Sequence, residues 1–265
     1  MDMFSSEFND FCKHFVREKS FKVIDGKFGS VSLYKHKPTQ KNFIVKYIKT
    51  KQFNAIEPYV HYLMKGNKHF VNLYYSFNWL RGHLLIMDYV KEGDLFDFCQ
   101  KRKVTEIECK HIVKQIVEAL NALHMYKLVH NDIKLENVLC DDRMHVTLCD
   151  YGMCQHIGVE SIYDGTVDYF SPEKIKGANY DAHFDWWAVA ILIYELLTHH
   201  NHPFKIDNDE ELTVAKLEKR QFRNINFDRI MSTQVKSLLQ SMLTFKLMYR
   251  LKTYKEIINH SFFIM

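Results

Sequence analysis

One short polar segment and one later carboxylate supply residue types that a phosphoryl transfer needs. Residues 130–137 read HNDIKLEN, which places Asp132, Lys134 and Asn137 within six residues, and Asp150 follows Asn137 by thirteen residues. Such a transfer depends on positioning the reactants and stabilising charge, and carboxylate, ammonium and amide groups do both. Taken alone, the segment could equally be a polar turn. The prediction therefore depends on its neighbours.

Two glycines upstream could let the backbone approach an anion. The sequence GKFGSV spans residues 26–31, with glycines at Gly26 and Gly29. Without a Cβ, glycine allows backbone N–H groups to lie close to phosphate oxygens. The same spacing between strands is also common in ordinary hairpins.

Lys46 lies in a β-rich run and requires an anionic partner if it is half-buried, because burying an unpaired ammonium is costly. Glu57 is the only acidic residue between Lys46 and Asp88, so it is the local candidate. Pro58 follows, and proline is tolerated in the first turn of a helix but not in its interior. We therefore expect a short helix, from about Pro58 to Lys65, that begins close to Glu57. A solvated lysine on an edge strand is the alternative.

The elements around these residues change from strands to helices along the chain. Alternation after Gly29 predicts a strand with Val31 and Leu33 on the buried face and Ser32 on the other, and the runs 43–48 and 84–90 predict two more. Helical patterns follow two capping-box signatures, at Thr105 with Glu108 and at Thr253 with Glu256, and also occupy residues 185–197 and 235–243.

The order of these segments resembles that of the protein kinases. HNDIKLEN and Asp150-Tyr151-Gly152 are similar to the HRD…N and DFG motifs of that family. Gly26, Gly29 and Val31 resemble the end of its glycine-rich loop, in which Ile24 replaces the first glycine. Farther along, the similar elements are Ser171-Pro172-Glu173 for APE, Arg250 for the arginine that pairs with it, and Asp185-Trp186-Trp187 for the start of the central helix.

This resemblance covers the chain from about Phe21 to its end and implies an α+β, bilobal protein kinase fold. We expect a small antiparallel β-sheet lobe with one short helix over residues 1–87, a hinge at 88–93 and a larger, mainly α-helical lobe over 94–265.

The resemblance also implies the roles of individual residues. Asp132 would accept or orient the proton of the substrate hydroxyl, and Lys134 would neutralise charge on the transferring γ-phosphoryl. Asn137 and Asp150 would hold Mg²⁺, with Mn²⁺ as an alternative ion. The positions expected to bind the ATP cofactor are Ile24, Gly26, Gly29, Val31, Lys46, Glu57, Met87, Asp88 and Val90.

One feature of the sequence indicates specificity for serine and threonine, and another indicates activity without phosphorylation of the activation segment. Lys134 in the catalytic loop and Gly165-Thr166 before Ser171 resemble serine/threonine rather than tyrosine kinases. Asn131 replaces the family's HRD arginine, which commonly pairs with a phosphorylated residue of the activation segment. Because asparagine has no charge to offer, we expect activity that does not require phosphorylation within residues 153–170.

The residues expected to bind the protein substrate are Asp94, Glu136, Thr166 and Glu195. The three acids match positions at which arginine-preferring kinases bind basic residues, although each alone could be an ordinary surface acid.

With HND, DYG and a compact core, the chain is most similar to the protein kinase-1 family of baculoviruses. That resemblance implies a protamine-like, DNA-condensing protein as substrate and a role in very late gene expression. The short helix near Glu57 suggests a homodimer through its outer face.

The composition and the arrangement of charges argue against several other classes of protein. With 265 residues, 47% of them hydrophobic and 26% charged, the chain is typical of a folded globular protein. The longest aromatic-aliphatic run, residues 186–194, is about half of what a membrane helix needs. Acidic residues at the start argue against a secretion signal, so we expect a cytoplasmic or nuclear protein of the host cell, with no membrane partner. A net charge of +4 is too mild to predict direct binding of nucleic acid.

Two other functions remain open. A pseudokinase or scaffold that acts by partner binding is favoured slightly by Ile24, Asn131 and the short helix, but Lys46, Glu57 and the other catalytic positions are all retained. A kinase-like phosphotransferase for small molecules is disfavoured by the SPE and DWW elements, which resemble the branch that acts on proteins.

Overall fold

The computed structural model describes residues 12–21, 29–207, 209–223, 225, 227 and 232–264. Ile24 and Gly26 of the predicted nucleotide site lie outside these ranges. The chain divides into an N-terminal unit that ends at Lys91 and a C-terminal unit that begins at Glu92, within the predicted hinge segment. Among the described residues, no helix is both long and apolar enough to cross a membrane.

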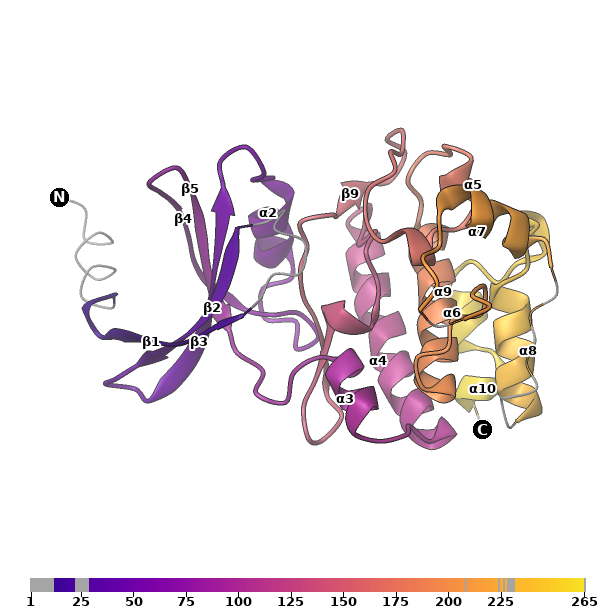
Figure 1. The fold of residues 1–265 in the computed structure, drawn as a ribbon, viewed down its shortest axis with the longest axis horizontal. Helices are drawn as coiled ribbons and strands as arrows, with labels where there is room; N and C mark the ends of the chain where they lie inside the picture. Colours follow the sequence, from indigo (N-terminus) through magenta and orange to yellow (C-terminus); the bar gives the residue numbers. More distant parts are fainter. Residues whose placement is uncertain are drawn as a thin grey trace. The chain divides into compact units, whose positions relative to one another are not determined.

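The N-terminal unit is built on a five-stranded antiparallel sheet with the order β1-β2-β3-β5-β4 (Figure 1). The strands are β1 Phe15–Phe21, β2 Ser30–His36, β3 Lys41–Lys49, β4 Leu73–Trp79 and β5 Gly82–Asp88. β2, β3 and β5 correspond to the three predicted strands, whereas β1 and β4, the two strands at the edges of the sheet, were not predicted.

β1 also changes the environment of β2. Ser32 was expected on an exposed face of β2 but is buried. Its hydroxyl accepts a hydrogen bond of 3.0 Å from Nη2 of Arg17, which lies on β1. The alternation of apolar and polar residues therefore predicted the strand correctly. It did not predict the burial of Ser32, because the neighbouring strand β1 was not predicted.

The helix of this unit, α2, spans Ile56–Leu63 and packs against β4. The Oδ1 atom of Asn54 accepts a 3.0 Å hydrogen bond from the backbone N–H of Ile56 where the helix begins. Glu57 and Pro58 both lie in the first turn, where proline is tolerated. The prediction of a short helix that begins close to Glu57 is confirmed, although it ends two residues before Lys65.

The C-terminal unit is mainly helical, so the α+β prediction is confirmed. Its α-helices are α3 Leu95–Lys101, α4 Glu106–Met125, α5 Pro172–Ile175, α6 Ala182–Thr198, α7 Val214–Gln221, α8 Thr233–Met242, α9 Tyr254–Ile258 and α10 Ser261–Ile264. Its short strands are β6 Leu128–Val129, β7 Val138–Cys140, β8 Val146–Leu148 and β9 Gln155–His156. Both predicted capping boxes are present, at the starts of α4 and α9.

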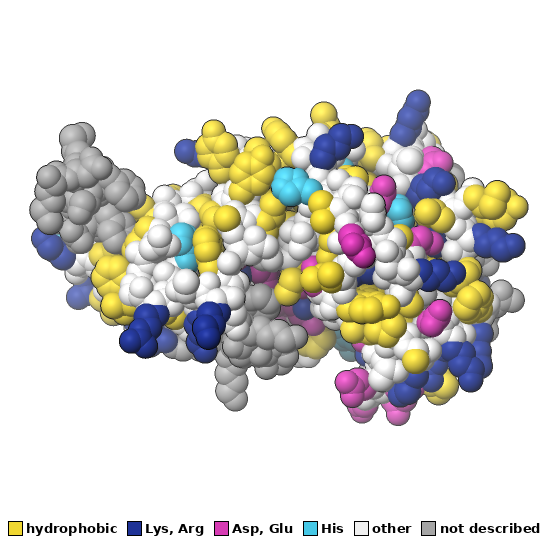
Figure 2. All heavy atoms as spheres, turned by 90° about the horizontal axis from the view of Figure 1, so that it is seen from above, with side chains coloured by type: hydrophobic (Ala, Val, Ile, Leu, Met, Phe, Trp, Pro, Cys, Tyr) yellow, Lys and Arg dark blue, Asp and Glu magenta, His cyan; other side chains and the backbone are white. Residues whose placement is uncertain are grey.

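The core of the C-terminal unit surrounds α6. This helix is apolar on nearly all sides and packs against α4 and α8 (Figure 1). Burial on every side is what a helix with a continuous apolar surface requires. On the face shown in Figure 2, by contrast, basic, acidic and hydrophobic side chains are interspersed over the described residues of this unit.

Candidate active site

Asp185, in the first turn of α6, fixes the loop that follows β6. Its Oδ2 and Oδ1 atoms accept hydrogen bonds of 2.8 Å from the backbone N–H groups of His130 and Asn131, respectively. Nε2 of His124 lies 2.8 Å from Oδ2. Burial alone raises the pKa of Asp185, but His124, His130 and the Asn131 N–H outweigh it and hold the pKa below its usual value. An ionised, buried carboxylate therefore anchors the backbone immediately before Asp132.

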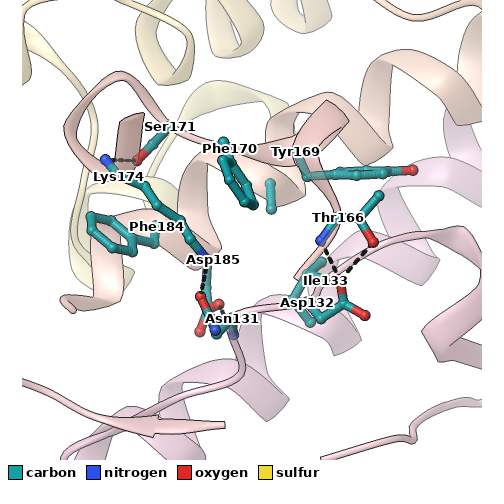
Figure 3. A pocket seen from close by; sticks show the side chains of 11 residues that line it. Asn131, Asp132, Ile133, Thr166, Tyr169, Phe170, Ser171, Lys174, Phe184 and Asp185 are labelled. Carbon is teal, nitrogen blue, oxygen red and sulfur yellow. Dashed lines mark hydrogen bonds between the residues drawn. The ribbon is translucent and has the colours of Figure 1, made fainter. Parts of the chain in front are cut away.

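The carboxylate of Asp132 is held from both sides. Its Oδ1 accepts hydrogen bonds from the backbone N–H of Thr166 at 3.0 Å and from the Thr166 hydroxyl at 2.7 Å (Figure 3). Its Oδ2 accepts a 2.8 Å bond from Nδ2 of Asn137. Nζ of Lys134 lies 3.4 Å from Oδ2 and donates to the Thr166 hydroxyl at 2.9 Å. Three other predicted site residues thus meet around the carboxylate of Asp132.

Asn137 and Asp150 flank the open end of the hairpin formed by β7 and β8. Val138 pairs with Leu148, and the backbone N–H of Cys149 donates to the carbonyl of Asn137 at 3.0 Å. Asp150 has φ of +58°, a left-handed conformation that is uncommon for residues other than glycine. The hairpin therefore places the predicted metal-binding amide and carboxylate on adjacent segments of chain.

The donor set at this hairpin fits a magnesium ion bound together with a nucleotide. Mg²⁺ in such sites takes one or two protein carboxylates and completes its shell with phosphate oxygens and water. Among the described residues, no group of three or more His, Cys, Asp or Glu side chains could hold a metal without such help. Burial lowers the pKa of Lys134, but Asp132, Glu136 and Asp150 outweigh it and raise the pKa, so this lysine stays charged.

In the N-terminal unit, Lys46 and Glu57 form the expected ion pair. Nζ of Lys46 lies 2.7 Å from Oε1 of Glu57, and the two residues are only 6% and 3% exposed. β3, which carries Lys46, lies between β2 and β5. The alternative of a solvated lysine on an edge strand is therefore wrong.

The other predicted nucleotide positions of this unit that the structure describes lie on or next to the same sheet. Gly29 has φ of +92°, and a Cβ added there would lie 1.9 Å from the carbonyl oxygen of Tyr47, so only glycine fits. Val31 on β2 pairs with Lys46 on β3. Met87 and Asp88 end β5, and Val90 follows before the unit's end at Lys91.

Comparison with known proteins decides the family. The protein kinase domain matches residues 18–263 of this chain. The chain belongs to the protein kinase family. It is 47% identical over 264 residues to serine/threonine-protein kinase 1 of Heliothis zea nuclear polyhedrosis virus, with 98% of each chain covered.

Two further relatives support the same assignment. The corresponding kinase of Lymantria dispar multicapsid nuclear polyhedrosis virus is 51% identical over 224 residues, 84% of this chain and 81% of that one. The solved structure of the Cydia pomonella granulovirus kinase aligns with a TM-score of 0.91 at 37% identity, covering 99% of each chain. These matches confirm the protein kinase fold and assign the chain to the serine/threonine-protein kinases of the baculovirus type.

Within the kinase, the three acids expected to bind substrate differ in exposure. Glu136 is exposed, whereas Asp94 caps α3 by accepting a 2.8 Å bond from the N–H of Asp97. Burial raises the pKa of Asp94, with further contributions from Asp97 and Glu136. Glu195 is 8% exposed and accepts a 2.5 Å hydrogen bond from the hydroxyl of Tyr169. Burial, together with Glu136 and Asp168, raises the pKa of Glu195 to about 8.

Other expected elements of the kinase also appear. Arg250 binds Glu173 through two hydrogen bonds, of 2.8 and 2.9 Å, so the predicted pair is present. Tyr151, which replaces the phenylalanine of DFG, is buried and donates from its added hydroxyl to the carbonyl of Leu148 at 2.5 Å. That hydrogen bond ties the residue after Asp150 to the end of β8.

Two residues that contact this site, Tyr169 and Lys174, were not predicted from the sequence. The Tyr169 hydroxyl donates a hydrogen bond to Glu195, and Nζ of Lys174 donates one to Oδ1 of Asn131. Lys174 belongs to a helix of only four residues, which is too short to show an amphipathic pattern. Its position directly after Ser171-Pro172-Glu173 was the only signal in the sequence.

Proposed function

We propose that this kinase transfers the γ-phosphoryl group of ATP to serine or threonine hydroxyls of arginine-rich proteins. The observation that carries the proposal is the arrangement around Asp132, whose two carboxylate oxygens are held by Thr166 and Asn137. A carboxylate fixed in this way can orient a substrate hydroxyl and accept its proton. Lys134, 3.4 Å away, supplies a positive charge for the transferring group.

The nucleotide requirements follow from the same residues. When bound, ATP supplies the phosphoryl group and Mg²⁺ neutralises charge on its phosphates. Asn137 and Asp150 would hold the ion. Lys46 would bind the α- and β-phosphates, and Glu57 orients the Lys46 ammonium through their 2.7 Å contact. The glycine at position 29 keeps the backbone next to β3 free of a side chain.

Arginine preference is proposed from the three acids of the C-terminal unit. The pKa values of Asp94 and of Glu195 are both raised in part by Glu136, so the three carboxylates share one electrostatic environment. Because guanidinium groups bind carboxylates through paired hydrogen bonds, such a group of acids fits arginine side chains of a substrate.

The test is transfer of radiolabelled phosphate from ATP to a serine peptide rich in arginine. Wild-type protein and Asp132→Asn are compared with Mg²⁺, with Mn²⁺ and with a chelator. Wild-type transfer that requires a divalent ion and is lost in the variant supports the proposal. Equal signals from both proteins would instead support the scaffold function. A second peptide with every arginine replaced by glutamine reports on specificity, and equal use of both peptides would reject the arginine preference.

The viral relatives motivate a physiological role. We propose that the substrate is a protamine-like protein that condenses viral DNA, that the kinase acts in the cytoplasm or nucleus of the infected cell, and that it supports very late gene expression. Transfer to a basic, arginine-rich protein requires no direct contact of the kinase with DNA. A virus carrying Asp132→Asn is expected to leave that protein unphosphorylated and to lower very late expression; normal levels of both would contradict this role.

We also propose a homodimer through the outer face of α2. The helix has eight residues, and two large side chains on it, Tyr59 and Tyr62, are 45% and 74% exposed. A second copy of the same face would cover these rings in a twofold contact. Sedimentation is expected to show a dimer that Tyr62→Lys converts to a monomer. A fully active wild-type monomer at high concentration would refute the proposal.

A further inference from the structure

Lys174 is a buried lysine whose ammonium joins two separate segments of the C-terminal unit. The residue is 3% exposed, on α5, which begins after Ser171. Its Nζ donates to Oδ1 of Asn131 at 2.5 Å, to the carbonyl of Asp164 at 2.5 Å and to Oδ1 of Asp164 at 3.1 Å. Figure 3 shows its side chain extending from α5 to Asn131.

These contacts account fully for the buried charge. An ammonium has three N–H donors, and three oxygen atoms lie within hydrogen-bond distance of this one. The ring of Phe170 lies 4.4 Å from Nζ and adds a cation–π contact. Burial lowers the pKa of Lys174, while the Asp164 carboxylate opposes the decrease. Removal of either partner would leave a buried polar group unpaired, which is costly.

The two partners of Lys174 lie next to the catalytic contact. Asn131 precedes Asp132, and Asp164 lies two residues before Thr166. Thr166 in turn donates to Asp132 through its N–H and its hydroxyl. Lys174 therefore closes a ring of contacts that contains the bond between Asp132 and Thr166.

Gly165 shows how closely the two segments approach within this ring. It has φ of +84°, and a Cβ added there would lie 2.7 Å from the carbonyl oxygen of Asn131. The space beside Lys174 is small as well. The cavity lined by Asn131, Thr166, Phe170 and Lys174 holds about 10 Å³, enough for roughly one water molecule and too little for a phosphate group.

We propose that Lys174 is a positioning residue that holds the activation segment against the catalytic loop without phosphorylation. The fixed carboxylate of Asp164 takes the place of an added phosphate, and Lys174 supplies the cation. A neutral residue at position 131 is then required, because an arginine there would bring a second positive charge against Lys174. The inference deepens the proposed transfer reaction and rests on it for its kinetic consequences.

The experiment uses phosphatase-treated wild type, Lys174→Met, Lys174→Arg and Asp164→Asn. Lys176→Met is the matched control, because Lys176 lies two residues away and is exposed. We measure kcat and KM for ATP and for an arginine-rich serine peptide, and amide hydrogen exchange over residues 153–170. Lys174→Met is expected to lower kcat by about tenfold or more with little change in KM for ATP, because misplacement of the reacting groups slows the chemical step. Exchange in the segment is expected to be faster.

The other variants separate positioning from general stability. Lys174→Arg keeps the charge and is expected to recover part of kcat, and Lys176→Met is expected to match wild type. Combining Lys174→Met with Asp164→Asn is expected to add little to either single change, since both break the same link. If a substitution at 174 prevents folding, Asp164→Asn alone gives the same comparison.

Two results would overturn the inference. One is a folded Lys174→Met that keeps wild-type kcat and wild-type exchange. The other is loss of wild-type activity after phosphatase treatment with recovery on rephosphorylation of residues 153–170. A failure of the proposed function gives a different result. Wild type would then transfer no phosphate, but amide exchange over residues 153–170 would still be faster in Lys174→Met than in wild type and unchanged in Lys176→Met. That difference would still show that Lys174 holds the activation segment.

Discussion

Replacing Glu195 by glutamine is expected to stabilise the kinase at neutral pH, but not below pH 4.5. Glu195 lies on α6 with 8% of its surface exposed, and its pKa is raised from 4.5 to about 8 by burial, Glu136 and Asp168. The folded protein therefore keeps a proton on Glu195 between these values, whereas the unfolded chain releases it. Unfolding is then favoured as the pH rises through this range.

The size of the effect follows from the two pKa values. Below pH 4.5 Glu195 is protonated in both states and the penalty is absent. Each pH unit above that costs about 1.4 kcal/mol, so about 3 kcal/mol of stability is lost by pH 7. Glutamine has the same shape and an oxygen that accepts the Tyr169 hydroxyl, but it carries no charge at any pH. The advantage of Glu195→Gln over wild type should therefore grow from about 1 kcal/mol at pH 5 to about 3 kcal/mol at pH 7.

Urea unfolding of both proteins at several pH values between 5 and 8 measures this difference directly. The control is Glu218→Gln, which removes an exposed carboxylate on α7. Parallel pH curves for wild type and Glu195→Gln would refute the reasoning.

The same protonation has a functional consequence, because Glu195 must ionise before it can pair with arginine. KM for the arginine-rich peptide is therefore expected to fall between pH 6.5 and 8.5 in wild type and to stay constant in Glu195→Gln.

Three further substitutions test other parts of the structure. Glu173→Gln leaves the buried guanidinium of Arg250 without its counter-charge and is expected to lower the free energy of unfolding by about 3 kcal/mol; a loss below about 1 kcal/mol in urea unfolding would contradict this. Glu57→Gln removes the charge that orients Lys46 and is expected to raise KM for ATP by about tenfold, so an unchanged KM would count against that role. Gly165→Ala is expected to lower kcat by about tenfold, because the added Cβ would press against the carbonyl oxygen of Asn131. The control is Gly177→Ala, which is also at positive φ but has open space around its Cβ, and it should keep wild-type kcat. Equal effects of the two substitutions would exclude a specific contact at Gly165.

The ion pair between Lys46 and Glu57 could be predicted because the sequence left one choice. A buried lysine needs an anion, and only one acid lies between Lys46 and Asp88. The edge strands could not be found in the same way. β4 reads LYYSFNW and carries aromatic residues on both faces, while β1 reads FVREKSF and is rich in charged residues. β1 therefore lacks the simple alternation of apolar and polar residues that marks a half-buried strand, whereas residues 75–79 of β4 do alternate and were a signal that could have predicted it.

The catalytic residues were predicted by type and order, but their contacts were not. Thr166 and Asp132 are separated by 34 positions in sequence. Neither segment contains a pattern that predicts a hydrogen bond from the hydroxyl of Thr166 to the carboxylate of Asp132. The contact depends on Gly165, whose positive φ lets the activation segment approach the carbonyl of Asn131. Backbone geometry of this kind becomes visible only when both segments are placed in the fold.

The neutral residue at position 131 shows how a missing charge can be misread from sequence alone. Asparagine in place of the family's arginine suggests that position 131 has no charge with which to bind a phosphorylated activation segment. In the structure the cation comes from Lys174, 43 positions later, and the anion from Asp164. Asn131 accepts a hydrogen bond from that lysine and donates one to the carbonyl of Met153 at 2.9 Å, so it contacts the activation segment directly through Met153 and indirectly through Lys174. The substitution therefore belongs to a different arrangement of charges, and restoring arginine alone, as in Asn131→Arg, is expected to weaken the link between the two segments.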